Sequence, residues 1–356
     1  MTNLALPHIQ EMAPYKPPLE GRTQYPGLRL DFNERTVPPA KAVIDVLRSF
    51  GNQPQTHLYP EYFGLEAEIA SYAGVESDQV MVTNGTDQAI DVLLRTFSGR
   101  GDKVIIPRPA FSMYEQYARV NGNAISRPTY AGSELAFPDD EIVAALDEDA
   151  RVLILANPNN PTGDLLSTDK IAELAEQSED TIVFVDEAYF EFSQSTAAGL
   201  IETMPNVIVS RTFSKAFGLA ALRIGYVLAS QPHIDEMLKV RGPYDVNQLG
   251  GLAASAALGS LDDTRRYATE VMEPAKNLVE EFFDRSGVPF HPSAANFLLF
   301  KPRDALGAFQ KLREEGVLVR PQTDPTISDS LRVTIATIPE MEAFIDTYQR
   351  AVLQGA

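Results

Sequence analysis

The sequence predicts an α/β protein in which a helix-covered sheet is followed by a smaller α+β unit. From about Pro39 onward, short apolar runs alternate with stretches of helical periodicity, a pattern typical of α/β sheets. Near Asp263 the pattern changes to one long helical stretch, followed by shorter strands and helices. With 356 residues, 44% of them apolar, the chain is long enough to form more than one domain.

A proline-rich arm precedes the first element of the sheet. Prolines at seven of the first 40 positions predict an extended segment that lies over the rest of the molecule. We therefore expect an N-terminal arm at residues 1–38 that joins the small domain, a large domain at 39–260 and a small C-terminal domain at 261–356.

Periodicity places the elements of both domains. Apolar runs predict strands in the large domain at residues 79–83, 103–107, 152–156, 181–185, 207–210 and 224–229. Helical periods predict helices at 87–97, 167–177 and 234–240. In the last third, the pattern predicts a long helix over 262–287, strands at 296–300, 317–320 and 331–335, and helices at 305–315 and after Pro339.

Composition and charge exclude several classes of protein. A net charge of −19 argues against a nucleic-acid partner, which requires a basic face. No apolar run approaches the ~20 residues of a membrane span, and the start of the chain lacks a signal-peptide pattern, so we expect no membrane partner and a cytoplasmic location. The four histidines have no ligand spacing and there is no cysteine, so we expect no metal.

Polar or aromatic side chains follow nearly every predicted strand, where ligands collect in open α/β sheets. After the first strand, Gly85 allows close backbone approach, and Thr86 and Asp87 begin a helix whose free N–H groups favour phosphate. An ordinary capped turn would have the same sequence. The second strand is followed by Phe111, a flat ring suited to stacking, and the third by a rigid Asn- and Pro-rich loop that includes Asn160.

The fourth strand ends in Asp186, with Tyr189 three residues further on. A carboxylate directly after a buried strand is costly unless it meets a cation, and a protonated pyridine nitrogen would be such a partner. Tyr189 is placed to reach the phenolic oxygen of the same ring. This pair therefore suits an aromatic, nitrogen-containing cofactor.

The fifth strand leads into the most informative stretch of the chain, which contains Thr212, Ser214, Lys215 and, eight residues later, Arg223. The amine can form a Schiff base with an aldehyde, while the hydroxyls and the guanidinium bind phosphate oxygens. A lone lysine in a polar loop is usually only solvated. The matching groups after the other strands favour a phosphorylated aldehyde cofactor instead.

Together these residues resemble the fold-type-I pyridoxal-phosphate enzymes, specifically the class I and II aminotransferases, over nearly the whole chain. Within that group the chain is most similar to the histidinol-phosphate aminotransferases, in the stretches 59–62, 212–223, 316–321 and 331–337. The resemblance implies a large domain with a mostly parallel seven-stranded sheet between helices, a smaller α+β domain, pyridoxal 5'-phosphate as the cofactor, and a homodimer.

The resemblance implies a role for each residue of the cofactor site. Lys215 would hold the cofactor and move the substrate proton, and Asp186 would keep the ring nitrogen protonated. Asn160 and Tyr189 would hydrogen-bond the phenolic oxygen, and Phe111 would stack on the ring. The phosphate would be bound by the backbone of Gly85 and by Thr86, Thr212, Ser214 and Arg223, with Asp87 nearby, and by the partner subunit's Tyr59.

The resemblance also implies the substrate side. Arg332 would bind a substrate carboxylate and Arg320 a second anionic group, while Tyr15 and Tyr114 would contact the substrate side chain. The expected reaction transfers an amino group from L-histidinol phosphate, the donor, to 2-oxoglutarate, the 2-oxo acid acceptor. An aromatic amino-acid aminotransferase is the close alternative; a decarboxylase of the threonine-phosphate type and a non-enzymatic ligand sensor are more distant ones.

The chain departs from the family pattern at three places. Residues 33–36 read Asn-Glu-Arg-Thr where Asn-Glu-Asn-Pro is usual, Gln88 stands where an acid is usual, and Phe111 replaces a more common Tyr. The first two places lie near the expected substrate entrance or its support. We therefore expect them to affect the substrate rather than the cofactor.

Overall fold

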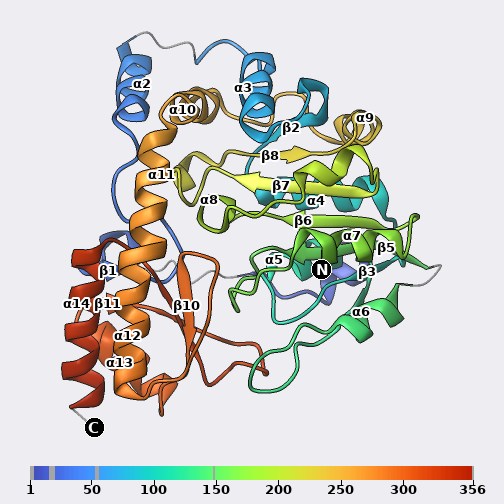
Figure 1. Cartoon of the computed structure of the whole chain (residues 1–356). Helices are drawn as coiled ribbons and strands as arrows, with labels where there is room; N and C mark the ends of the chain where they lie inside the picture. Colours follow the sequence, from blue (N-terminus) through green and yellow to red (C-terminus); the bar gives the residue numbers. More distant parts are fainter. Residues whose placement is uncertain (1–3, 16–20, 53–55, 147–148, 355–356) are drawn as a thin grey trace.

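A seven-stranded sheet forms the centre of the larger part of the molecule (Figure 1), in a computed structural model that describes residues 4–15, 21–52, 56–146 and 149–354. Its strands, in spatial order, are β2 (Val80–Thr83), β8 (Gly225–Leu228), β7 (Val207–Thr212), β6 (Ile182–Asp186), β5 (Ala150–Ala156), β3 (Lys103–Ile105) and β4 (Ala124–Ser126). Strand β8 runs antiparallel to both neighbours, and the other pairs are parallel. The predicted mostly parallel seven-stranded sheet is confirmed.

Both faces of this sheet are buried under helices, because successive side chains of its strands point to opposite sides. In β6, Val183 and Val185 belong to the apolar layer on one face, whereas Ile182 and Phe184 belong to the layer on the other. The first layer includes α2 (Lys41–Asn52), α3 (Phe63–Ala73), α6 (Asp139–Ala145), α7 (Thr168–Glu176) and α10 (Gln248–Leu258). The second includes α4 (Thr86–Phe97), α5 (Met113–Asn121) and α9 (Gln231–Val240).

The C-terminal part packs around a third apolar cluster. Helices α11 (Leu261–Glu270) and α12 (Lys276–Ser286) form one long rod, joined by a wider turn that contains Pro274 (Figure 1). A four-stranded antiparallel sheet, in the order β12 (Arg320–Pro321), β13 (Leu331–Thr334), β10 (Phe297–Phe300) and β9 (Phe290–His291), lies beside α13 (Ala305–Glu314) and α14 (Ile338–Tyr348). The long helix predicted over residues 262–287 is therefore present, interrupted only at this turn.

The arm after residue 21 joins the small domain through a separate two-stranded sheet. Its strand β1 (Leu28–Arg29) pairs in parallel with β11 (Val317–Leu318), and the fully buried Leu30 links Leu318 to Thr334 through backbone hydrogen bonds of 2.8 and 2.9 Å. Gly27 permits this approach, since a Cβ there would lie 1.9 Å from a carbonyl oxygen. The prediction of a single strand at 317–320 was wrong. This stretch forms two strands, β11 and β12, because the arm pairs with β11 only.

Several elements escaped prediction. The unpredicted elements that line or support the site are α5, α10 and the short α8 (Phe190–Ser193). Helix α10 consists largely of Gly, Ala and Leu, so it shows little amphipathic periodicity, and α8 is too short to have any. A one-turn helix, α1 (Pro7–Gln10), packs against α5. Within the described ranges, no helix is long and apolar enough to cross a membrane.

Candidate active site

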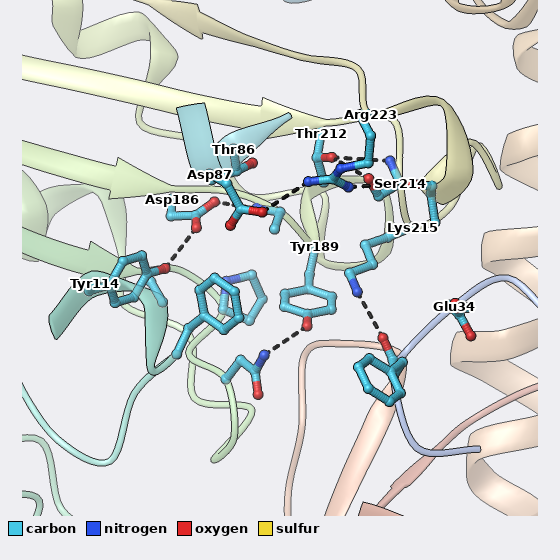
Figure 2. A pocket seen from close by; sticks show the side chains of 17 residues that line it. Glu34, Thr86, Asp87, Tyr114, Asp186, Tyr189, Thr212, Ser214, Lys215 and Arg223 are labelled. Atoms are coloured by element: carbon cyan, nitrogen blue, oxygen red, sulfur yellow. Dashed lines mark hydrogen bonds and ion pairs between the residues drawn. The ribbon is translucent and has the colours of Figure 1, made fainter. Parts of the chain in front are cut away.

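A cavity of 360 Å³ opens at the carboxyl ends of the parallel strands (Figure 2). The loops after β2, β3, β5, β6 and β7 form most of its wall, and the arm closes one side. The cavity brings together ten predicted cofactor-site residues: Thr86, Asp87, Phe111, Asn160, Asp186, Tyr189, Thr212, Ser214, Lys215 and Arg223. Of the other two, Gly85 borders Arg223 and Tyr59 lies elsewhere.

Lys215 lies on the turn that follows β7 and points into the cavity. Its Nζ donates a 2.8 Å hydrogen bond to the backbone carbonyl of Phe32 in the arm. Burial, followed by the nearby Arg332 guanidinium, lowers the pKa of Lys215 to about 8, although the Glu34 carboxylate acts in the opposite direction. The amine is therefore uncharged at mildly alkaline pH, the form that attacks an aldehyde.

Asp186 lies at the end of β6, enclosed by hydrogen-bond donors. It accepts from the Tyr114 hydroxyl at 2.7 Å, from the Ser210 hydroxyl at 3.2 Å and from the Ala188 amide at 3.2 Å. Burial nevertheless raises the pKa of Asp186 to about 6, because no cation of the described chain pairs with this carboxylate. The site therefore suits a ligand that supplies a positive charge.

The orientation of the Tyr114 side chain differs from the predicted contact with the substrate side chain. Its side chain is only 1% exposed, and its hydroxyl is directed at Asp186 rather than at the substrate side of the cavity. The physical reason is its place in the first turn of α5, whose inner face packs on the sheet beneath the cavity. Tyr114 thus holds the carboxylate in position.

The Tyr189 hydroxyl is held by two side-chain amides. Asn160 donates to it at 3.1 Å and Asn33 at 2.9 Å. We did not predict Asn33 as a site residue, although it begins the stretch 33–36 that departs from the family pattern. Asn33 is 1% exposed and adopts a φ of 54°, a left-handed conformation in which Asn is more common than most other residues.

A cradle of hydrogen-bond donors lies where α4 begins. Gly85 has a φ of 76°, and a Cβ at this position would lie 2.8 Å from an Nη atom of Arg223. The Thr86 hydroxyl is buried without a hydrogen-bond partner in the described part of the chain. Free N–H groups at a helix N-terminus, an unpartnered hydroxyl and a guanidinium together form a site for an anion.

Two more hydroxyls and a carboxylate complete this cradle. The Thr212 and Ser214 hydroxyls lie 2.9 Å apart beside the cavity, and Asp87 forms a 2.9 Å ion pair with Arg223 (Figure 2). The cradle, the lysine amine and the buried carboxylate are spaced around one cavity, as a phosphorylated pyridine aldehyde requires. The residues present therefore fit pyridoxal 5'-phosphate.

A second cavity, of 170 Å³, adjoins the first at Lys215 and Asn160, which line both. Tyr15, Arg320 and Arg332 lie on its wall, as predicted for the substrate side. Within the described residues, neither arginine forms an ion pair with a carboxylate. Two arginines that form no ion pair in the described chain, next to the lysine, define a site for anionic groups of a substrate.

Arg332 is held from two sides. It donates to the Asn160 side-chain oxygen and, at 2.8 Å, to the backbone carbonyl of Asp31, while its Nε has no partner in the described chain. Burial and the neighbouring Arg320 lower the pKa of Arg332 to about 10. A bound carboxylate or phosphate would offset this burial.

The unusual Gln88 has a structural explanation. Its side-chain oxygen accepts from the Asn84 amide at 2.7 Å, and its side-chain nitrogen donates to the Asp245 carboxylate. Asp245 also pairs with Arg241 at 3.0 Å. An acid at position 88 would place a second carboxylate against Asp245, so an amide is the better partner here.

Tyr59 lies outside both cavities of this chain. Its side chain is 75% exposed, and its ring stacks on that of Tyr244 with centroids 4.2 Å apart.

No group of three or more His, Asp or Glu side chains in the described ranges is placed to hold a metal ion.

Comparison with known proteins identifies the family. The sequence profile described as aminotransferase class I and II matches residues 26–346. The chain is 33% identical to histidinol-phosphate aminotransferase 2 of Methylococcus capsulatus over 99% of both sequences. The crystal structure of histidinol-phosphate aminotransferase from Sinorhizobium meliloti, in complex with pyridoxal-5'-phosphate, has a TM-score of 0.90 at 24% identity, covering 100% of this chain and 99% of that one. L-threonine-O-3-phosphate decarboxylase from Porphyromonas gingivalis has the same fold, with a TM-score of 0.79 at 23% identity over 91% of this chain and 98% of that one.

The chain belongs to the class I and II aminotransferases. It is a pyridoxal-phosphate-dependent transaminase of fold type I, as the sequence predicted. The narrower resemblance to the histidinol-phosphate aminotransferases is also confirmed.

Proposed function

We propose that this transaminase moves the amino group of L-histidinol phosphate to 2-oxoglutarate, giving imidazole-acetol phosphate and L-glutamate in histidine biosynthesis. The observation that carries the proposal is the pair Arg320 and Arg332 beside Lys215, with no carboxylate partner in the described chain. Both reaction partners bear an anionic group, a phosphate in one and carboxylates in the other, and both must bind at the same lysine in turn. Relatives at about one-third identity bear the same activity in their names.

We assign the chemistry to the residues around the first cavity. When bound, pyridoxal phosphate supplies an electron sink for the bonds at the substrate's Cα. Asp186 would keep the ring nitrogen protonated, and the Tyr189 hydroxyl, held by two side-chain amides, would hydrogen-bond the phenolic oxygen. Lys215 accepts the proton from Cα and returns it on the cofactor side, a transfer that suits an amine with a pKa of about 8.

We assign cofactor binding to the remaining side chains of the first cavity. Phe111 stacks on the ring, and the cradle at the start of α4 binds the phosphate with Gly85, Thr86, Thr212, Ser214 and Arg223. Asp87 holds Arg223 in place through their ion pair. The arm closes the cavity from the other side and keeps water away from Lys215.

The visible absorbance of the purified holoenzyme tests the substrate assignment. We expect histidinol phosphate to bleach the cofactor band quickly and phenylalanine to bleach it slowly, with 2-oxoglutarate restoring it in both cases. Lys215→Ala serves as the control, because it removes the amine that holds the cofactor. No bleaching of the wild-type band by histidinol phosphate would contradict the proposal.

An aromatic amino-acid aminotransferase is the second candidate. The rings of Tyr15, Phe32 and Phe111 line the substrate cavity and would contact phenylalanine as well as an imidazole. Faster bleaching by phenylalanine than by histidinol phosphate would favour this candidate. Release of carbon dioxide from an amino-acid phosphate, without any 2-oxo acid, would identify a decarboxylase instead.

We also propose a cytoplasmic homodimer in which Tyr59 reaches the phosphate cradle of the partner subunit. Its exposure and its distance from the cavities of its own chain support this arrangement. Mixed dimers of Lys215→Ala and Tyr59→Ala subunits should regain one complete site and hence part of the activity. No recovery on mixing would show that Tyr59 does not act across the interface.

We further propose that the chain divides functionally into the arm (1–38), the large cofactor domain (39–260) and the small domain (261–356). The third apolar cluster draws most of its members from residues 267–348, and β1 pairs with β11; both observations support this division. Limited proteolysis that releases a folded fragment ending near residue 260 would test the second boundary.

A further inference from the structure

Arg35 stands where the family pattern usually has Asn, and it makes contacts that an Asn side chain is too short to make. Its side chain is 4% exposed although it carries a full charge. One Nη donates to the backbone carbonyl of Ala216 at 3.1 Å, and the other forms a 2.7 Å ion pair with Asp263 in α11. Its guanidinium lies over the Tyr267 ring, 4.6 Å from the centroid.

These contacts join three segments that are far apart in the sequence. Ala216 directly follows Lys215, and Asp263 and Tyr267 lie on α11. The aliphatic part of Arg35 packs where Gly218 leaves room, since a Cβ on Gly218 would lie 3.0 Å from its Cδ. Arg35 therefore connects the arm to the turn after β7 that carries Lys215, called the lysine turn below, and to the long helix.

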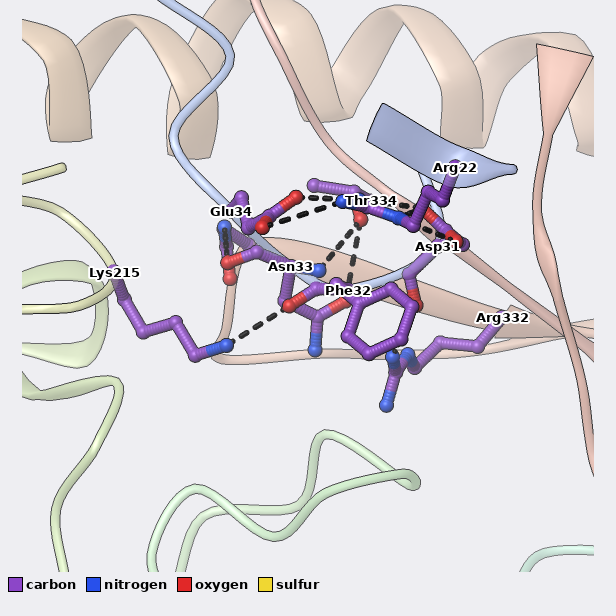
Figure 3. A network of polar contacts seen from close by, with 9 residues as sticks. Arg22, Asp31, Phe32, Asn33, Glu34, Lys215, Arg332 and Thr334 are labelled. Carbon is purple, nitrogen blue, oxygen red and sulfur yellow. Dashed lines mark hydrogen bonds and ion pairs between the residues drawn. The ribbon is translucent and has the colours of Figure 1, made fainter. Parts of the chain in front are cut away.

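The neighbouring arm residues reach the active site directly. The backbone carbonyl of Phe32 accepts the hydrogen bond of the lysine amine (Figure 3). Asn33 donates to the Tyr189 hydroxyl, and Glu34 lines the cofactor cavity. Thr36, which stands where the family pattern usually has Pro, donates to Glu340 in α14 at 2.6 Å. Residues 35 and 36 thus anchor on the helices, while residues 32–34 face the chemistry.

We propose that Arg35 is a positioning residue that holds arm residues 32–34 over Lys215 by joining the Ala216 carbonyl to Asp263. The proposal rests on the function proposed above only in taking Lys215 as the cofactor lysine. Arg35 touches neither cavity. It acts through the backbone of the arm and of the lysine turn.

The pKa of the Lys215 amine should show whether the arm is held in this position. Apart from burial, the charges that act on Lys215 are those of Arg332, Glu34, Arg223 and Asp186. Because burial is the main cause of its lowered pKa, a loosened arm that admits water should move that pKa back toward its ordinary value. The effect can be measured without any amino donor, as the rate at which apoenzyme captures pyridoxal phosphate at different pH values.

We would compare Arg35→Ala with Arg266→Ala in this assay. Arg266 pairs with the same Asp263 at 3.0 Å but is 74% exposed, and among the described residues it has no hydrogen bond or ion pair to the arm or to the turn that carries Lys215. The midpoint of the capture profile is the pH at which apoenzyme captures pyridoxal phosphate at half its maximal rate. For Arg35→Ala we expect this midpoint to rise by about 0.5–1 pH unit and kcat to fall about ten- to a hundredfold. Arg266→Ala should match the wild type in both.

Two further variants separate positioning from general loss of stability. Asp263→Asn weakens the anchor of Arg35 and should shift the midpoint in the same direction by a smaller amount, even if Arg35→Ala folds poorly. Arg35→Lys can reach one of the two partners and should recover part of kcat. An unchanged midpoint in both Arg35→Ala and Asp263→Asn would overturn the inference. An unchanged capture profile in Lys215→Ala would instead overturn the choice of cofactor lysine.

Discussion

Replacing Lys215 by methionine should change how the stability of the apoenzyme depends on pH. The side chain is half-buried with its amine inside the cavity, and burial lowers the pKa of Lys215 from its ordinary 10.5 to about 8. At about 1.4 kcal/mol per pH unit, this difference corresponds to about 3–4 kcal/mol of destabilisation of the folded state when the amine is charged. Methionine has similar length and no proton to bind.

The direction follows from proton linkage. The folded-state pKa is below the unfolded value, so between about pH 8 and 10.5 the unfolded chain holds a proton that the folded chain has lost. The wild type therefore gains stability as pH rises through this window, and Lys215→Met does not. The stability of the variant relative to the wild type should fall by about 3 kcal/mol between pH 7 and 10.5.

Urea unfolding of the two apoenzymes, at pH values from 7 to 10.5, measures this difference. Other titrating groups are common to both proteins and cancel in the comparison. Lys239→Met, which removes a lysine that is 65% exposed, serves as the control for loss of a solvated ammonium. A difference between Lys215→Met and wild type that stays flat across the range would refute the reasoning.

Three further predictions concern groups around the same cavity. Asp186→Asn should retain the cofactor but lose most of kcat, because the ring nitrogen is no longer held protonated; near-normal kcat would rule out this partner. Tyr114→Phe removes a hydrogen-bond donor that lowers the pKa of Asp186, so the pKa of Asp186 should rise and activity should fall about tenfold. If the acid limb of the pH–rate profile does not shift to higher pH, this prediction is contradicted. Arg332→Lys replaces a fork by a point charge and should lower kcat/KM for 2-oxoglutarate by about 30- to 100-fold, or about 2–3 kcal/mol, while the cofactor band stays unchanged.

Much of the fold and of the cofactor site could be predicted from local sequence. Buried strands such as β6 are short apolar runs, and the polar groups that follow them converge because the carboxyl ends of parallel strands share one edge of the sheet. Asp186 and Lys215 follow adjacent strands β6 and β7, so their convergence is a consequence of topology. Helix α10 was missed because its small apolar residues carry no helical period.

The sequence by itself thus determined the chemistry of the ligand, since residue types after successive strands specify a lysine, a carboxylate and a phosphate cradle. Only the tertiary structure decided what surrounds them. The acceptor of the Lys215 amine is the backbone carbonyl of Phe32, 183 residues away, and a carbonyl has no sequence signature. Likewise, the Tyr114 hydroxyl donates to Asp186 because α5 packs on the sheet. Arg35 pairs with Asp263 because the arm passes beside α11. Burial and long-range contacts of this kind set the pKa values of the site, and they exist only once the chain has folded.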